Sequence, residues 1–167
     1  MARLDEAVTE WSTDTDYDPG LDTNSPNDIF VDGRLPTPCG VNSWGSTLAV
    51  TCYSYQNRTG TDEDYVDGPY RRMIDADIYM NMEVAASPDW WIGSGLPPRS
   101  DRYHFKGILT HEFGHTVFLN DLYASCTGRH NSTDWYTMCG GYSGADDSYW
   151  SRTLHADDKG SANLAYP

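Results

Sequence analysis

Two histidines four residues apart, His111 and His115, stand inside an apolar stretch with helical spacing, and a glutamate directly follows the first. Side chains at i and i+4 lie one turn apart on nearly the same face of a helix, so both imidazoles can reach one metal ion at about 2.0–2.1 Å. Glu112 is rotated by about 100° from His111 and lies beside the metal, where a general base for a water molecule would stand. The rest of the chain must then supply a third ligand, a floor and a substrate groove.

A helix is predicted over residues 102–118, because this segment carries an apolar stripe with helical spacing. The stripe precedes the two histidines and consists of Phe105, Ile108 and Leu109. Ser100 or Asp101 can cap the start of this helix, since a side-chain oxygen there satisfies an unpaired backbone N–H. The histidines and Glu112 are therefore expected on a regular element rather than in a loop.

Asp121 is the candidate third metal ligand. It lies six residues beyond His115, a spacing that lets the chain leave the helix and turn back toward the ion. Two neutral imidazoles and one carboxylate leave one coordination position open for water, which is the arrangement of catalytic rather than structural zinc sites. His130 is the main rival for the third position, and His155 is a weaker one.

The chain has 167 residues and a formal charge of −14, from 25 acidic and 11 basic residues. Its length suits a single domain over residues 1–167, with an upper part at about 1–121 and a lower part at about 122–167. The acidic balance argues against binding to nucleic acids and to anionic membranes, which both attract basic proteins. No apolar run approaches the roughly 18 residues of a membrane span.

An acidic, tyrosine-rich and lysine-poor composition suits an extracellular protein, and we expect a secreted monomer. The amphipathic, polar N-terminal stretch does not have the pattern of a signal peptide. If the protein is secreted, we therefore expect its signal and any pro-segment to precede this sequence.

Four cysteines, Cys39, Cys52, Cys126 and Cys139, permit three disulfide pairings. The two sequential loops, Cys39–Cys52 and Cys126–Cys139, are of equal size, and we favour this pairing in an oxidising compartment. Buried free thiols are the alternative. A zinc knuckle is not expected, because no two cysteines stand two to four positions apart.

The rest of the chain alternates short apolar segments with long polar connections. Apolar residues at i, i+3, i+4 and i+7 predict a helix over residues 2–12, and acidic residues favour the start of a last helix over about 157–166. Strands are predicted over three apolar, β-prone runs, at 29–31, 47–53 and 73–82. Residues 139–149 are expected to form turns that wall the site. These elements predict an α/β fold.

A structural calcium ion is a further candidate, because Asp14, Asp16 and Asp18 alternate as ligands do in a calcium loop. Gly20, however, stands one place late for an EF-hand, and position twelve is Ser25 rather than glutamate. A solvated turn is therefore the favoured interpretation of this segment, and calcium binding is the alternative.

The pattern HExxHxxxxxD, formed by His111, Glu112, His115 and Asp121 and followed by a methionine in a tight turn, resembles the metzincin metalloproteases. Its aspartate version is similar to the snapalysin type. The resemblance implies zinc as the cofactor, the two histidines and the aspartate as its ligands, and Glu112 as the general base.

Met138, in the segment WYTMCG, resembles the Met-turn of this family, which implies a hydrophobic floor under the zinc ion. Residues 152–166 are similar to the end of a matrixin catalytic domain, and residues 76–78 are similar to the matrixin edge strand that pairs with substrate. The resemblance implies a twisted, mixed and mostly parallel sheet with an antiparallel edge strand, an active-site helix and a loop-rich C-terminal part. Substrate would lie between the edge strand and that helix as an added strand.

Phe118 departs from the pattern of the family, which has a glycine three residues after the second histidine. That glycine lets the helix end with a positive φ, which is costly for a bulky side chain. Either the chain turns differently, with Asn120 accepting the left-handed conformation, or the third ligand is reached in another way.

Other zinc-protease layouts fit less well. Gluzincins take a downstream glutamate as a ligand, but no glutamate follows Glu112. An aspzincin-type protease would take its third ligand from a GTxDxxY-like segment, which residues 144–149 match poorly. We therefore expect a zinc-dependent endopeptidase that acts on protein or peptide substrates. The alternative is a non-catalytic, zinc-containing protein-binding module on the same scaffold, and the intact Glu112 argues against it.

Overall fold

The structure is a computed structural model of the chain. It describes residues 2–14, 27–31, 33–57, 71–82, 90–96, 102–122, 136–140 and 145–165. These residues form four α-helices, one short 3-10 helix and a three-stranded mixed sheet. The prediction of an α/β fold is confirmed at this level.

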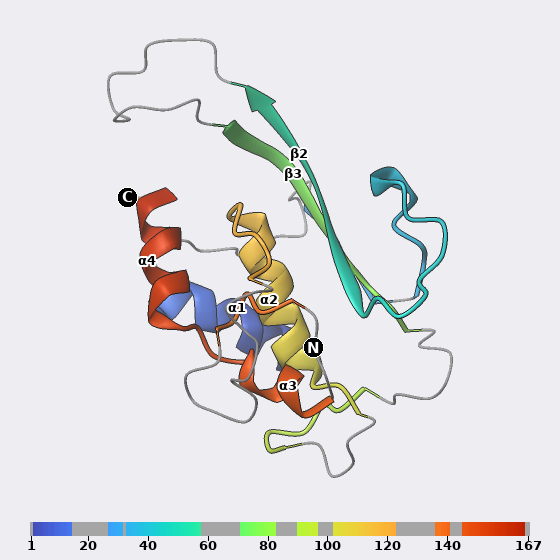
Figure 1. The fold of residues 1–167 in the computed structure, drawn as a ribbon, viewed down its shortest axis with the longest axis vertical. Coiled ribbons are helices and arrows are strands. Elements are labelled where there is room, and N and C mark those ends of the chain that lie inside the picture. The colour runs from blue at the N-terminus through green and yellow to red at the C-terminus, as the bar shows by residue number, and fades with distance from the viewer. Residues whose placement is uncertain are drawn as a thin grey trace.

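The helix α2 (Phe105–Thr116) lies at the centre of the described part of the chain (Figure 1). Its most extensive contacts with described elements are with α1 (Ala2–Asp14), β2 (Ala49–Asn57), β3 (Arg71–Met80) and α3 (Ala145–Trp150). In Figure 1 the long pair β2 and β3 runs past one side of α2, and α1 lies on the other. The predicted helix over residues 102–118 is thus the element around which the others pack.

The sheet has the strand order β1-β3-β2. β1 (Ile29–Phe30) pairs with β3 in parallel, and β2 pairs with β3 in the antiparallel direction along its whole length. The expected mixed sheet with an antiparallel edge strand is therefore present, but its longest pairing is antiparallel rather than parallel.

The expectation that residues 76–78 form the edge strand is wrong. These residues lie in β3, which has a strand on each side, and the backbone N–H of Ile78 donates to Asp28 at 2.8 Å from the β1 side. A run of strand-forming residues indicates a strand but not its neighbours, because pairing joins residues far apart in sequence. Among the described residues, β2 is the antiparallel edge strand.

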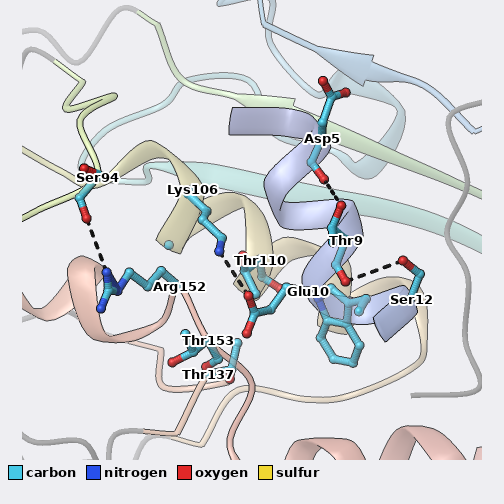
Figure 2. A network of polar contacts seen from close by, with 12 residues as sticks. Asp5, Thr9, Glu10, Ser12, Ser94, Lys106, Thr110, Thr137, Arg152 and Thr153 are labelled. Atoms are coloured by element: carbon cyan, nitrogen blue, oxygen red, sulfur yellow. Dashed lines mark hydrogen bonds and ion pairs between the residues drawn. The ribbon is translucent and has the colours of Figure 1, made fainter. Parts of the chain in front are cut away.

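The helix α1 packs its apolar stripe against α2, as the spacing of its residues predicts. Trp11 is fully buried, and its indole N–H donates to the carbonyl of Thr110 at 3.0 Å. Lys106 and Glu10 add an ion pair at 3.0 Å between the same two helices (Figure 2). The main buried hydrophobic cluster of the described residues consists of Ala7, Val8, Trp11, Ala49, Ile78, Met80, Ile108, Leu109, Phe113, Val117, Leu154 and Ala162.

The short helix α3 was not predicted, because its residues were expected to form turns. It approaches α2 where Gly107 has no side chain: a Cβ built there would lie 2.8 Å from the carbonyl carbon of Ser148. Figure 2 shows the following segment, in which Arg152 donates to the carbonyl of Ser94 at 3.4 Å. The glycine is thus required by a close backbone approach, which sequence spacing does not reveal.

The helix α2 begins at Phe105, and His104 is its N-cap, with Nδ1 accepting from the backbone N–H of Gly107 at 3.2 Å. The caps expected at residues 100 and 101 are therefore wrong, because the helix begins three residues later than predicted. The last helix is α4 (Ala156–Ala165), which matches its predicted range. No helix in the described ranges is both long enough and apolar enough to cross a membrane.

A disulfide joins Cys39 to Cys52, with their Cα atoms 5.5 Å apart, so this half of the predicted pairing is confirmed. It links the 3-10 helix η1 (Thr37–Cys39) to β2. Cys139 is also disulfide-bonded. Cys126 lies outside the described residues, as do residues 15–26 with most of the candidate calcium segment.

Candidate metal centre

His111 and His115 lie side by side on α2, as their spacing predicts. Their ring centroids are 4.9 Å apart, and the ring planes are nearly perpendicular. His111 is buried, and His115 is partly exposed at the wall of a cavity. Both rings therefore reach the same space, which one ion could share.

Each imidazole is oriented by a backbone carbonyl. Nδ1 of His111 lies 2.8 Å from the carbonyl oxygen of Thr137, and Nδ1 of His115 lies 2.7 Å from that of Leu119. A carbonyl can only accept, so Nδ1 of each ring carries the proton. In the neutral rings Nε2 then has the free lone pair, which is the form that binds a metal.

Phe118 forms the turn by which the chain leaves the helix. Its φ is 63°, so it takes the left-handed conformation itself and the suggested shift of this conformation to Asn120 is wrong. The N–H of Leu119 donates to Gly114 at 3.1 Å, and that of Phe118 donates to His115 at 3.0 Å. This is the Schellman helix ending, with phenylalanine at the position that glycine usually occupies.

Aromatic contacts surround Phe118 and offset the cost of its backbone conformation, which is about 1–2 kcal/mol. Its ring meets Tyr53 and Tyr55 edge-on, with centroid distances of 5.7 and 6.4 Å. Such pairs contribute about 0.5–1.5 kcal/mol each beyond the apolar area they bury. The turn therefore depends on β2, a strand more than sixty residues away.

This turn brings Asp121 back to the two histidines. Its Oδ1 lies 3.1 Å from Nε2 of His111 and 3.8 Å from Nε2 of His115. Ligands held about 2.0–2.1 Å from a tetrahedral ion lie about 3.3–3.4 Å from one another, so the two distances bracket that value. The structure thus brings together the three residues that the sequence selected as ligands.

Of the two rival ligands, His155 stands apart from this group. Within the described stretches, His111, His115 and Asp121 are the one set of metal-binding side chains whose ligand atoms converge, all within 4.8 Å. His155 lies elsewhere, with Nδ1 accepting from the backbone of Asp157 at 3.3 Å. His130 lies outside the described residues.

Glu112 borders the same cavity, which has a volume of about 710 Å³ and lies between β2 and α2. Glu112 is only 5% exposed. The hydroxyl of Thr51 donates to Oε2 of Glu112 at 2.6 Å. Thr51 could not be predicted from the sequence, because no local pattern indicates a contact between residues 61 positions apart.

Met138 lies against the helix that carries the two histidines. It is 1% exposed, and a Cβ built on Gly114 would come within 2.9 Å of its Cε. The glycine between the two histidines therefore makes room for the methionine. The N–H of Leu122 donates to the carbonyl of Met138 at 2.8 Å, which ties the segment after Asp121 to the methionine turn.

Thr137 connects this turn to α4. Its backbone N–H donates to the buried carboxylate of Asp158 at 3.0 Å, and its carbonyl orients His111. Its hydroxyl donates to the carbonyl of Thr153 at 2.9 Å. Burial raises the pKa of Asp158, and the hydrogen bonds from Thr137 offset this only in part. Neither Thr137 nor Asp158 was predicted from the sequence to be a site residue.

The pKa of His111 also lies above its usual value. Burial alone would lower it, but the hydrogen bond to Asp121 and the negative charge of Glu112 outweigh burial. Below this raised pKa, a proton on Nε2 competes with a metal ion for the same lone pair. Metal binding to this group should therefore strengthen as the pH rises.

The chain was compared with protein-family models, with curated proteins and with solved structures, and none of them matches it. The chemistry of the site therefore rests on its own geometry. Two imidazole nitrogens and one carboxylate oxygen suit a borderline metal such as zinc, and three protein ligands leave one position open.

Proposed function

We propose that this chain is a zinc-dependent endopeptidase of the metzincin type. The observation that carries the proposal is the convergence of His111, His115 and Asp121 within 4.8 Å, beside a cavity that the carboxylate of Glu112 also borders. The φ of 63° at Phe118 supports the family resemblance, since this residue adopts the conformation for which the family uses glycine.

The residues would divide the reaction as follows. A zinc ion held by the three ligands would supply a positive charge that polarises the substrate carbonyl and makes a water molecule more acidic. The carboxylate of Glu112 takes a proton from the water as its oxygen bonds to the peptide carbon. Glu112 then gives that proton to the departing nitrogen as the C–N bond breaks.

The edge strand β2 is the proposed platform for the substrate. The N–H of Asn81 donates to the carbonyl of Leu48, so the alternation of an antiparallel pair directs the backbone groups of Ala49, Thr51 and Tyr53 away from β3. All three residues line the cavity. An extended peptide added along this edge would pass the metal ligands, as in β-strand addition generally.

Hydrolysis of casein by the zinc-loaded protein tests the proposal. We expect cleavage that a chelator abolishes and zinc restores. Glu112→Gln should lower kcat by at least about 100-fold while zinc is retained, because it removes the general base and leaves the ligands. Asp157→Asn, at a carboxylate whose side chain is 71% exposed, is the control and should keep full activity.

The ligand assignment has its own measurement. Asp121→Ala should lower zinc affinity by more than about 100-fold, since even residues that only orient a ligand change affinity by 10–100-fold. Full zinc retention by this variant would refute the assignment. A wild-type protein that holds zinc and cleaves nothing would refute the peptidase and favour the protein-binding module.

A further inference from the structure

Thr51 makes a short hydrogen bond to the proposed general base. Its hydroxyl oxygen lies 2.6 Å from Oε2 of Glu112 and 3.0 Å from the main-chain oxygen of the same residue. The hydroxyl has one proton to donate, and the charged oxygen at the shorter distance is the stronger acceptor. The value of 2.6 Å falls in the range of hydrogen bonds from hydroxyls to carboxylates.

This contact restrains a side chain that would otherwise have several rotamers. Glu112 is buried, and in the described part of the chain Thr51 is the hydrogen-bond donor to its carboxylate. A glutamate on a helix can rotate about three side-chain bonds. With Oε2 engaged, the other carboxylate oxygen is left to accept a proton from water.

We propose that Thr51 is a positioning residue that holds Glu112 in the orientation needed for proton transfer. The proposal rests on the proposed peptidase function, which it makes more specific. Thr51 also lies on β2, and its backbone groups face the edge that no described strand covers, where the substrate would bind. The residue that would pair with the peptide is thus the one whose side chain holds the base.

This arrangement couples the place of binding to the place of proton transfer. A peptide on the edge of β2 would be set in register with Thr51, and through the hydroxyl with Glu112. Loss of the hydroxyl leaves the backbone of the edge strand intact, so it should affect kcat and not KM. A hydroxyl needed only to join β2 to α2 would have no such selective effect.

Thr51→Val and Thr51→Ser, both zinc-loaded, test the proposal on a peptide substrate. Valine keeps the shape but loses the donor, and kcat should fall roughly tenfold to 100-fold, as small misplacements of catalytic groups do. KM and zinc content should stay within about twofold of wild type, since uniform binding is unchanged. Serine retains the donor and should restore kcat to within about threefold of wild type.

Thr9→Val is the matched control, because it removes a hydroxyl that donates to the Asp5 carbonyl on the surface of α1 (Figure 2). It should leave kcat unchanged. An active wild type with an equally active Thr51→Val would overturn the role of Thr51 alone. A zinc-loaded wild type that cleaves nothing would instead overturn the peptidase function.

A second measurement needs neither zinc nor activity. The free energies of unfolding of metal-free wild type, Thr51→Val, Glu112→Leu and the double variant, measured in urea, form a double-mutant cycle. We expect the two changes to be non-additive, because each removes one partner of the same bond. Additive shifts would show that the two side chains do not interact, and the proposal would fail.

Discussion

The two ends of α2 are held by different kinds of contact. Near its start, Gly107 lies directly against the backbone of Ser148, and the carbonyl of Thr110 accepts from Trp11. Beyond its last turn, Phe118 adopts a left-handed conformation, and the carbonyl of Leu119 is bonded to His115. The first end is held by close packing, and the second by a turn that needs outside support.

This difference matches the parts that the two ends play in the site. The packed end orients a regular helix, which needs no strain to place His111 and His115 one turn apart. The turn must reverse the chain within a few residues to deliver Asp121. Changes at the packed end should therefore unfold the protein, and changes at the turn should have smaller effects.

Gly107→Ala should have the largest effect on the free energy of unfolding. A Cβ there would lie 2.8 Å from the carbonyl carbon of Ser148, and a backbone group cannot rotate away as a side chain can. We expect a loss of about 3 kcal/mol or more, at the upper end of overpacking effects. Urea denaturation measures it.

Gly160→Ala is the control for this change, because Gly160 lies in α4 and nothing lies within 4 Å of a Cβ built there. Alanine should stabilise this helix by about 0.8–1.0 kcal/mol. If Gly107→Ala were as stable as wild type, the close packing of α3 on α2 would be wrong.

Phe118→Gly and Phe118→Ala isolate the strain in the turn. Both lose the contacts with Tyr53 and Tyr55, so both should be less stable than wild type. Glycine accepts a φ of 63° and alanine does not, so the glycine variant should be more stable than the alanine variant by about 1 kcal/mol. Thermal unfolding of the two variants measures the difference.

The same pair of substitutions at the exposed Ser161, within α4, should give the opposite order. There alanine should be the more stable by about 1 kcal/mol, because the backbone is helical. If Phe118→Gly were no more stable than Phe118→Ala, the left-handed turn at Phe118 would be excluded.

Asp158→Asn should have the smallest effect, confined to the pH dependence of stability. Because burial raises the pKa of Asp158 in the folded protein, the folded state holds its proton more tightly than the unfolded state. Ionisation of this carboxyl therefore lowers the free energy of unfolding as the pH rises from 3.8, its pKa in the unfolded state, through its raised pKa in the folded state.

Unfolding free energies of wild type and Asp158→Asn, measured from pH 3 to 7, test this sign. The variant should gain stability relative to wild type as the pH rises through that window. A difference that stays constant with pH, or changes in the other direction, would contradict the raised pKa.

Much of the fold could be predicted from local patterns. The apolar spacing around Trp11 and Leu109 predicted α1 and α2, and β-prone runs predicted the three strands. Strand order could not be predicted, and residues 76–78 were wrongly placed at the edge. A strand's side-chain pattern records which face is buried, whereas its partners are chosen by contacts across the whole chain.

The site residues also divide into those that local spacing predicted and those that it did not. His111, Glu112 and His115 were selected by their spacing alone, because a helix fixes the geometry of residues four apart. Thr51 and Asp158 were missed, since each meets its partner across a long stretch of chain.

The sequence by itself determined that two imidazoles and a carboxylate share one helix, and that an aspartate follows within reach. Tertiary structure decided that Asp121 approaches both histidines, because Phe118 adopts a strained turn against which Tyr53 and Tyr55 pack. Local hydrogen bonding sets the period of a helix, but a costly backbone conformation persists only where distant parts of the chain supply the contacts that offset it.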